Sequence, residues 1–325
     1  MRAEVILIPA PAVGHLVSAV EFAKLLVSRD DRISVSILIM NMSFDATFVA
    51  FTNHLKKDAP AHITFVDIPA LDEIIMTELM AKPKFYFFTW FIESQKGQVR
   101  DVVATIMNRS ESSKLVGFVI DMMCETMIDV ANEYNVPAYV LSTSSAAFLG
   151  LMFSDLSFQD NKNQGMHEYK DSDVELSVPC FLNPVPSKVL PSLLITEDSS
   201  SVFRTIAQRS RETKGIIVNT VLELEAYAIK SIVEDGNTPP VYHVGPIIKL
   251  ADVEIKMDYV KGTGCLVKAE EIERGIRCLM QEESETRKKA KEMKDICRKA
   301  TAKRGSSYTS VGQFIEDLMD SGALD

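Results

Sequence analysis

A histidine lies a few residues beyond the first apolar run of the sequence. Residues 11–16 read PAVGHL, a glycine turn that brings His15 to the start of a helical pattern just after the β-branched run 5–8. In open α/β sheets, ligands bind at the carboxyl ends of the strands. The positive end of a helix dipole disfavours an imidazolium, so we expect His15 to be neutral and able to act as a general base. The alternative is a histidine that only ends a loop.

Asp121 is the second candidate for acid–base chemistry. It ends the apolar run 115–120 and precedes a helical pattern over 127–131. Parallel strands would bring Asp121 and His15 to the same edge of a sheet, where the carboxylate could accept a hydrogen bond from one imidazole nitrogen. Such a bond fixes the tautomer and stabilises the imidazolium that forms in a reaction. Because aspartate is also a preferred N-cap residue, capping of the following helix is the alternative.

Two further segments could contact a ligand. Residues 142–145, STSS, follow another apolar run, but they contain no G-x-S-x-G motif, which disfavours a hydrolase with a serine nucleophile. These hydroxyl groups are typical of helix caps, and Ser144 is the one we consider for ligand contact. The aromatic residues 85–91, FYFFTWF, predict either core packing or the lining of an apolar pocket for a flat ligand. Residues 261–264, KGTG, match no phosphate-binding fingerprint and predict a turn.

Short apolar runs alternate with helical patterns through the first 250 residues. The runs cover 5–8, 33–39, 63–68, 115–120, 138–141, 215–219 and 241–244. This alternation predicts parallel βαβ units in a doubly wound α/β sheet. Residues 157–192 are rich in Asp, Asn, Ser and Pro, and we expect a long surface loop on the substrate side. After about residue 256 only helical patterns follow, over 272–280, 290–300 and 311–319.

The composition excludes several classes of partner. The 325 residues carry a net charge of −10, so no basic surface for a nucleic acid or an anionic membrane is expected. Five cysteines without a C-x-x-C pair predict neither a disulfide framework nor a zinc site and favour a cytoplasmic protein. No segment has the roughly 20 consecutive apolar residues that a membrane-spanning helix needs.

Several segments together resemble the plant secondary-product UDP-glycosyltransferases. They are VILIPAPAVGHLVSAVEFAKLL, FVIDMMCETMIDVANE, YVLSTSSAAFLGLM, KGIIVNTVLELEAYAI and VYHVGPI, with a final stretch from VEIKMDYVKGTG to SSYTSVGQFIEDLMD. The resemblance implies a GT-B fold in which residues 1–249 form a Rossmann-like acceptor-binding domain. Residues 250–325 would be a mainly helical remnant of the C-terminal domain, with the last helix docking back on the first domain.

The resemblance also implies a reaction. His15, partnered by Asp121, would take the proton of a hydroxyl on a phenolic or terpenoid acceptor, which would displace UDP from a UDP-sugar with inversion and without a metal. The candidate acceptor-binding residues are Gly14, Phe85, Phe88, Trp90 and Ser144.

One departure from the family pattern concerns the sugar donor. Intact members carry a signature whose core reads HCGWNS after the VGPI segment, and this sequence contains none. Its only tryptophan is Trp90, and all five histidines precede residue 244. We therefore expect the UDP-sugar site to be largely missing and catalysis to be impaired. The alternative is a non-catalytic binding module or a partner of an intact homologue. Uncovered apolar stripes on the helices at 272–280 and 290–300 also predict self-association.

Overall fold

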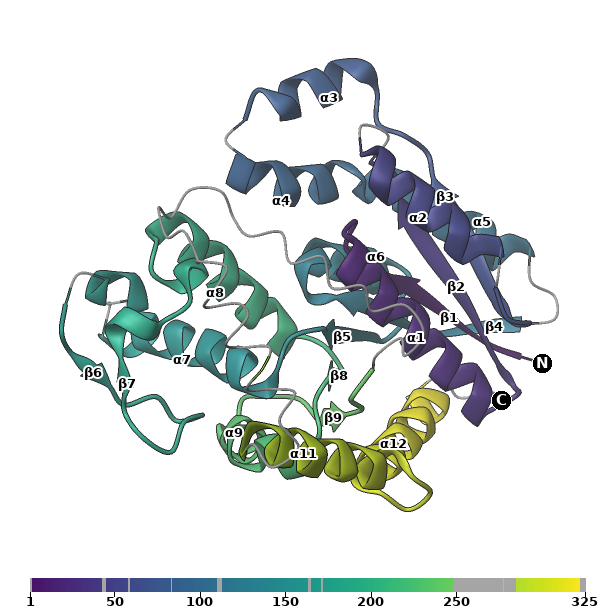
Figure 1. Cartoon of the computed structure of the whole chain (residues 1–325). Helices are drawn as coiled ribbons and strands as arrows, with labels where there is room; N and C mark the ends of the chain where they lie inside the picture. Colours follow the sequence, from purple (N-terminus) through teal and green to yellow (C-terminus); the bar gives the residue numbers. More distant parts are fainter. Residues whose placement is uncertain are drawn as a thin grey trace.

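The computed structural model describes residues 2–42, 45–57, 59–82, 84–109, 113–162, 165–170, 172–247, 277 and 285–321. Within these ranges the chain builds one seven-stranded parallel sheet flanked by helices (Figure 1). The strands are β1 (Arg2–Ile8), β2 (Ile33–Met40), β3 (Ile63–Ile68), β4 (Ser113–Asp121), β5 (Ala138–Ser142), β8 (Gly215–Val218) and β9 (Val241–His243). The prediction of a doubly wound parallel sheet is confirmed.

The chain adds strands first on one side of β1 and later, from β4 onward, on the other side, so the sheet has a switch point in its middle. The order is β3-β2-β1-β4-β5-β8-β9, so β1 and β4 are neighbours although about a hundred residues separate them in the chain. From β1 the chain moves to β2 on one side, and from β4 it moves to β5 on the other. With right-handed crossovers, the helices after β1 and β4 lie on opposite faces, which opens a crevice at the carboxyl ends of these two strands.

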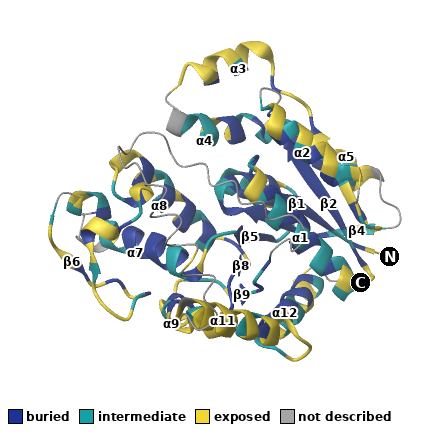
Figure 2. Ribbon diagram, viewed as in Figure 1, coloured by how far each residue is buried: buried dark blue, intermediate teal, exposed yellow. Residues whose placement is uncertain are grey.

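Some helices pack directly on the sheet, and others pack on neighbouring helices. The helices are α1 (Val13–Arg29), α2 (Ala46–Lys57), α3 (Glu73–Met80), α4 (Lys84–Ser94), α5 (Lys96–Arg109), α6 (Ile128–Glu133), α7 (Ala146–Lys162), α8 (Glu197–Arg211), α9 (Leu222–Glu234), α11 (Glu285–Thr301) and α12 (Ser306–Ser321). Helices α1 and α12 pack directly on the sheet, whereas α3, α7 and α11 pack on neighbouring helices. A 3₁₀ helix, η1 (Met122–Met127), separates β4 from α6. The stripe Leu16, Val20 and Ala23 of α1 is buried as its spacing predicts. Figure 2 shows the central strands almost wholly buried. None of the helices in the described ranges is both long and apolar enough to cross a bilayer.

The segment 157–192 differs from the predicted loop. Helix α7 extends into this segment and ends at Lys162. It is followed by the 3₁₀ turn η2 (Met166–Tyr169) and by a two-stranded sheet of β6 (Glu175–Leu176) and β7 (Val185–Pro186). The reason is a buried carboxylate on α7. Asp155 accepts hydrogen bonds from the Met166 amide and the Ser200 hydroxyl, both at 2.6 Å, and pairs with Arg204 at 3.2 Å. These bonds hold the polar segment against α7 and α8.

The last two helices pack on the rest of the chain. Helix α12 contacts α1, β4 and β9, and α11 lies beside α9 and α12 (Figure 1). On α11 Ala300 is buried, whereas Met293 is 51% exposed. The expectation that residues 290–300 have no surface to pack on is therefore wrong at the C-terminal end of that helix. The pattern over 272–280 and the turn at 261–264 lie outside the described residues, apart from Arg277, and self-association stays a prediction.

Phe314 is the central contact of α12, and its truncation tests the docking of this helix. Its ring lies 5.1 Å from that of Tyr139, 5.3 Å from that of Tyr242 and 5.7 Å from that of Phe22, measured between centroids. Phe314→Ala leaves a cavity among these rings, so we expect chemical denaturation to show a loss of about 3–5 kcal/mol in the free energy of unfolding. The control is the exposed Glu316→Ala, with a change within about 0.5 kcal/mol. Equal stability of the two variants would show that α12 does not depend on this contact.

Candidate functional site

His15 and Asp121 meet at the crevice between β1 and β4. The Nδ1 atom of His15 lies 2.8 Å from Oδ2 of Asp121, and the carboxylate is 1% exposed. The other carboxylate oxygen, Oδ1, accepts the amide of Met123 at 2.9 Å and so caps η1. The capping role and the partnership with His15, which the sequence leaves as alternatives, are both present because the two oxygens serve different donors.

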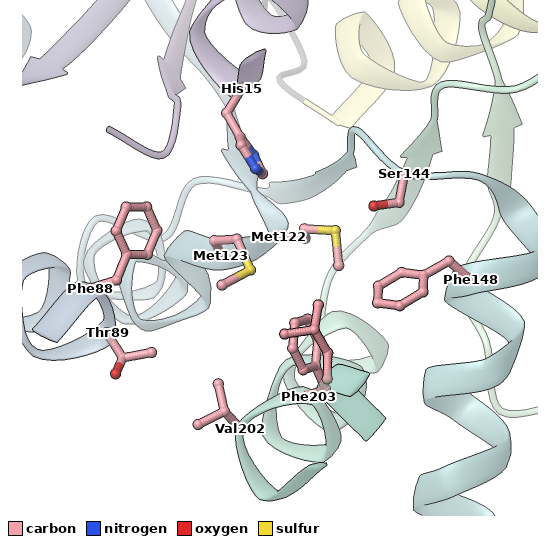
Figure 3. Close-up of a pocket in the computed structure, with 10 residues that line it drawn as sticks. His15, Phe88, Thr89, Met122, Met123, Ser144, Phe148, Val202 and Phe203 are labelled. Atoms are coloured by element: carbon pink, nitrogen blue, oxygen red, sulfur yellow. The ribbon is translucent and has the colours of Figure 1, made fainter. Parts of the chain in front are cut away.

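The hydrogen bond sets the orientation of the imidazole. A buried carboxylate accepts Nδ1–H, which leaves Nε2 of the neutral ring as the free acceptor. The hydroxyl of Thr143, in the segment after β5, lies 3.3 Å from the same Nδ1 atom. In Figure 3 the ring of His15 points from α1 into a cavity. The arrangement can therefore hold a proton acceptor at the edge of that cavity.

The pKa of His15 is raised from its ordinary value of 6.5. Burial lowers the pKa because it disfavours the charged ring, but the hydrogen bond to Asp121 and the negative charge of this carboxylate together outweigh burial. The helix dipole alone favours a lowered pKa, so the shift runs opposite to the one that the dipole favours, because the dipole argument leaves out the charge of Asp121. A raised pKa means that the protonated pair adds stability below pH 6.5, and that this contribution is lost as pH rises through the raised pKa.

The cavity below His15 has a volume of about 530 Å³, within the range of about 300–1,000 Å³ that is usual for small-molecule sites. Its walls come from α1, α4, η1, α8, the start of α7 and the segments before α7 and α8. They are formed by His15, Phe88, Thr89, Met122, Met123, Ser144, Phe148, Leu193, Val202 and Phe203. Most of these side chains are apolar or aromatic, so the cavity suits a largely apolar ligand with a polar group at His15.

The proposed acceptor-binding residues have different places in this structure. Phe88 and Ser144 line the cavity. Trp90 does not: it follows Phe88 by two residues on α4, about 200° around the helix, and stacks on Tyr86 with centroids 5.2 Å apart. Gly14 does not line it either, and is helical rather than part of a turn. The side chain of Phe85 lies outside the described residues.

Sequence reasoning missed most of the lining. Met122 and Met123 directly follow Asp121, and this adjacency was a usable signal because a residue next to a site residue on a strand end reaches the same crevice. Thr89 and Phe148 stand within segments that we considered. Leu193, Val202 and Phe203 lie outside the segments that we considered. Val202 and Phe203 reach the cavity through the packing of α8 against η1, and Leu193 belongs to the turn before α8. Within the described ranges, no group of three or more His, Cys, Asp or Glu side chains is placed to hold a metal ion.

Comparisons with known proteins agree with this geometry. No protein-family model matches the chain. UDP-glucose flavonoid 3-O-glucosyltransferase 6 of Fragaria ananassa is 45% identical over 256 residues, which are 76% of this chain and 51% of that protein. A glycosyltransferase of Siraitia grosvenorii crystallised with UDP superposes with a TM-score of 0.65 at 34% identity, over 77% of this chain and 52% of its own. Medicago truncatula UGT71G1 with UDP-glucose gives a TM-score of 0.62 at 32% identity, over 86% and 57%.

The region of the chain that these comparisons cover belongs to the plant UDP-glycosyltransferases, which have the GT-B fold. The chain spans about half the length of the curated relatives it matches.

The titration of His15 tests the electrostatics of the site. We expect NMR to give His15 a pKa above 6.5 in the wild type and below 6.5 in Asp121→Asn, because burial then acts without the opposing charge. Ser144→Ala, which removes a lining hydroxyl but no hydrogen bond to His15, serves as the control.

The same coupling should also appear in the stability of the protein. The difference in unfolding free energy between wild type and Asp121→Asn should be larger at pH 5.5 than at pH 9. An unchanged His15 pKa in Asp121→Asn would refute the coupling.

Proposed function

We propose that this chain binds a small hydroxylated acceptor in the cavity and that His15 accepts the proton of the acceptor hydroxyl. The observation that carries the proposal is the 2.8 Å contact between His15 and the buried Asp121 at the edge of an apolar cavity of about 530 Å³. The related proteins support it, since their names describe transfer of glucose to flavonoids. In the proposed reaction Asp121 is a positioning residue, and His15 is the catalytic base.

The proton transfer follows from the orientation of the ring. Asp121 keeps the proton on Nδ1, so Nε2 takes the hydroxyl proton while the oxygen attacks the anomeric carbon of a UDP-sugar. The bond from that carbon to the diphosphate oxygen breaks, and UDP leaves with the electron pair. The imidazolium that forms is stabilised by the Asp121 carboxylate. A positioned base of this kind typically contributes about 10²–10⁴-fold in rate.

We further propose that transfer by this chain alone is impaired. Its sequence has no segment like the HCGWNS donor signature. Without groups that hold the uridine and the diphosphate, the leaving group is not positioned, and positioning can account for about 7–11 kcal/mol of a barrier. The chain then supplies the acceptor-binding and proton-accepting part of the reaction.

The ionisation of a bound phenol tests the base directly and needs no sugar donor. 7-Hydroxycoumarin is a suitable probe, because its phenol and phenolate forms have distinct absorption spectra. Bound to the wild type, its apparent pKa should fall, since the imidazolium of His15 stabilises the phenolate. In His15→Gln the apolar cavity should hold the apparent pKa at or above that of the free phenol. The exposed His54→Gln is the matched control and should behave like the wild type. Saturable binding with the same apparent pKa in wild type and His15→Gln would remove His15 from the role of base.

A transfer assay tests the proposed impairment. With UDP-glucose and 7-hydroxycoumarin, the purified chain should form no glucoside above background, as measured by chromatography with mass detection. Turnover by the wild type that disappears in His15→Ala would contradict the proposed impairment of sugar transfer, but it would support the role of His15 as the catalytic base.

A further inference from the structure

The cavity is polar at one end and apolar at the other. At the polar end His15 points inward from α1, and the Ser144 oxygen points inward beside Phe148 (Figure 3). Within the described part of the chain, no hydrogen bond to the Ser144 hydroxyl is found. This end therefore offers a proton acceptor and a hydroxyl within one small region.

The opposite end offers nothing comparable. Among the described residues, Val202 and Phe203 line this end (Figure 3); they have no polar side-chain atoms, and their amides and carbonyls belong to the interior of α8. Thr89 lines the cavity too, but its hydroxyl donates to the Tyr86 carbonyl at 3.0 Å. Figure 3 shows the oxygen of Thr89 turned away from the centre. A ligand hydroxyl buried against Val202 and Phe203 would lose its hydrogen bonds to water, and these two side chains could not replace them.

The middle of the cavity favours a flat ring. Met122 and Met123 form one wall, and thioether sulfur atoms make favourable contacts with aromatic rings. Phe148 and Phe203 form another wall as an edge-to-face pair, with centroids 5.7 Å apart and planes at 85°. Phe88 lies across the cavity from Phe148 (Figure 3). Among the described residues that line the cavity, His15 alone has an ionisable side chain, so these residues offer no second partner to a charged substituent on the ligand.

From these three features we infer that the acceptor is an uncharged, flat aromatic molecule with its reacting phenol at one end and an apolar group at the other. An acceptor with a second hydroxyl at the far end should bind more weakly than one with an apolar group there. This inference rests on the proposed function, because it assumes that the reacting hydroxyl lies at His15. Val202 and Phe203 then determine the specificity, because neither side chain can form a hydrogen bond with a polar group at the far end of the ligand.

A matched pair of ligands tests the inference. 4-Phenylphenol and 4,4′-dihydroxybiphenyl differ only in the hydroxyl at the far end. By isothermal titration calorimetry on the full chain, 4-phenylphenol should bind about tenfold more tightly, the cost of leaving one hydroxyl unpaired. Val202→Thr keeps the shape of the side chain and adds a hydroxyl at the far end, and should narrow this ratio. Thr205→Val makes the reverse change at an exposed position of α8 and should leave the ratio unchanged.

Three other outcomes would overturn the inference, and the last of them would overturn the proposed function as well. Equal affinities in the wild type would show that the far hydroxyl reaches water, and they would overturn the inference while leaving the proposed function in place. A ratio that Val202→Thr does not change would mean that general hydrophobicity, and not this end of the cavity, sets the preference, which also overturns the inference. Binding of neither phenol to a folded sample would overturn the proposed function together with the inference.

Discussion

The hydrogen bond between His15 and Asp121 is the contact on which the site depends. It joins two segments that lie 106 residues apart, and it does so where β1 and β4 run side by side and the strand order reverses. Two constraints make the bond possible. The Asp121 carboxylate is buried with one oxygen fixed by the η1 cap, so only its second oxygen is free for the ring. The turn of chain after β1 then presents His15 to that oxygen from the first turn of α1.

The cavity is built around this contact by elements from distant parts of the chain. Helix α4 packs on η1, α8 packs on η1 and α7, and the buried Asp155 ties α7 to α8 through Ser200 and Arg204. The position of Val202 and Phe203 therefore depends on a polar network outside the cavity. Replacing one partner in such a buried ion pair leaves the other charge unpaired and typically lowers the free energy of unfolding by about 3–5 kcal/mol. The shape of the cavity is thus set by the packing of the whole sheet-and-helix unit, and not by a single loop.

The sequence predicted those features that local patterns encode. Each of the seven strands is an apolar run of its own, and His15 and Asp121 each follow such a run, so their meeting at one sheet edge needed only the parallel topology. The helix dipole, which local sequence reveals, favours a lowered pKa for His15. The pKa is raised because the charge of Asp121 acts on the ring from a neighbouring strand, and local sequence does not show that contact.

Other features depend on three-dimensional packing. The rotation of α4 turns Trp90 away from the cavity although Phe88 lines it, and a run of seven aromatic and polar residues does not reveal that rotation. The polar stretch at 157–162 is helical because α7 continues into it, where a loop was expected. Phe203 belongs to an amphipathic stripe whose burial is predictable, but the stripe alone does not tell core from cavity wall.

If a small phenol occupies the cavity below His15, the methyl groups of Met122 and Met123 in the cavity wall respond to it most directly. In a chain labelled with [¹³C-methyl]methionine, the signals of Met122 and Met123 can be assigned through Met→Leu variants. Binding in this cavity should shift both signals saturably and with one dissociation constant on addition of 4-phenylphenol, whereas the signal of the exposed Met293 of α11 should stay unchanged. Saturable binding that shifts Met293, or that leaves Met122 and Met123 in place in a folded sample, would contradict it.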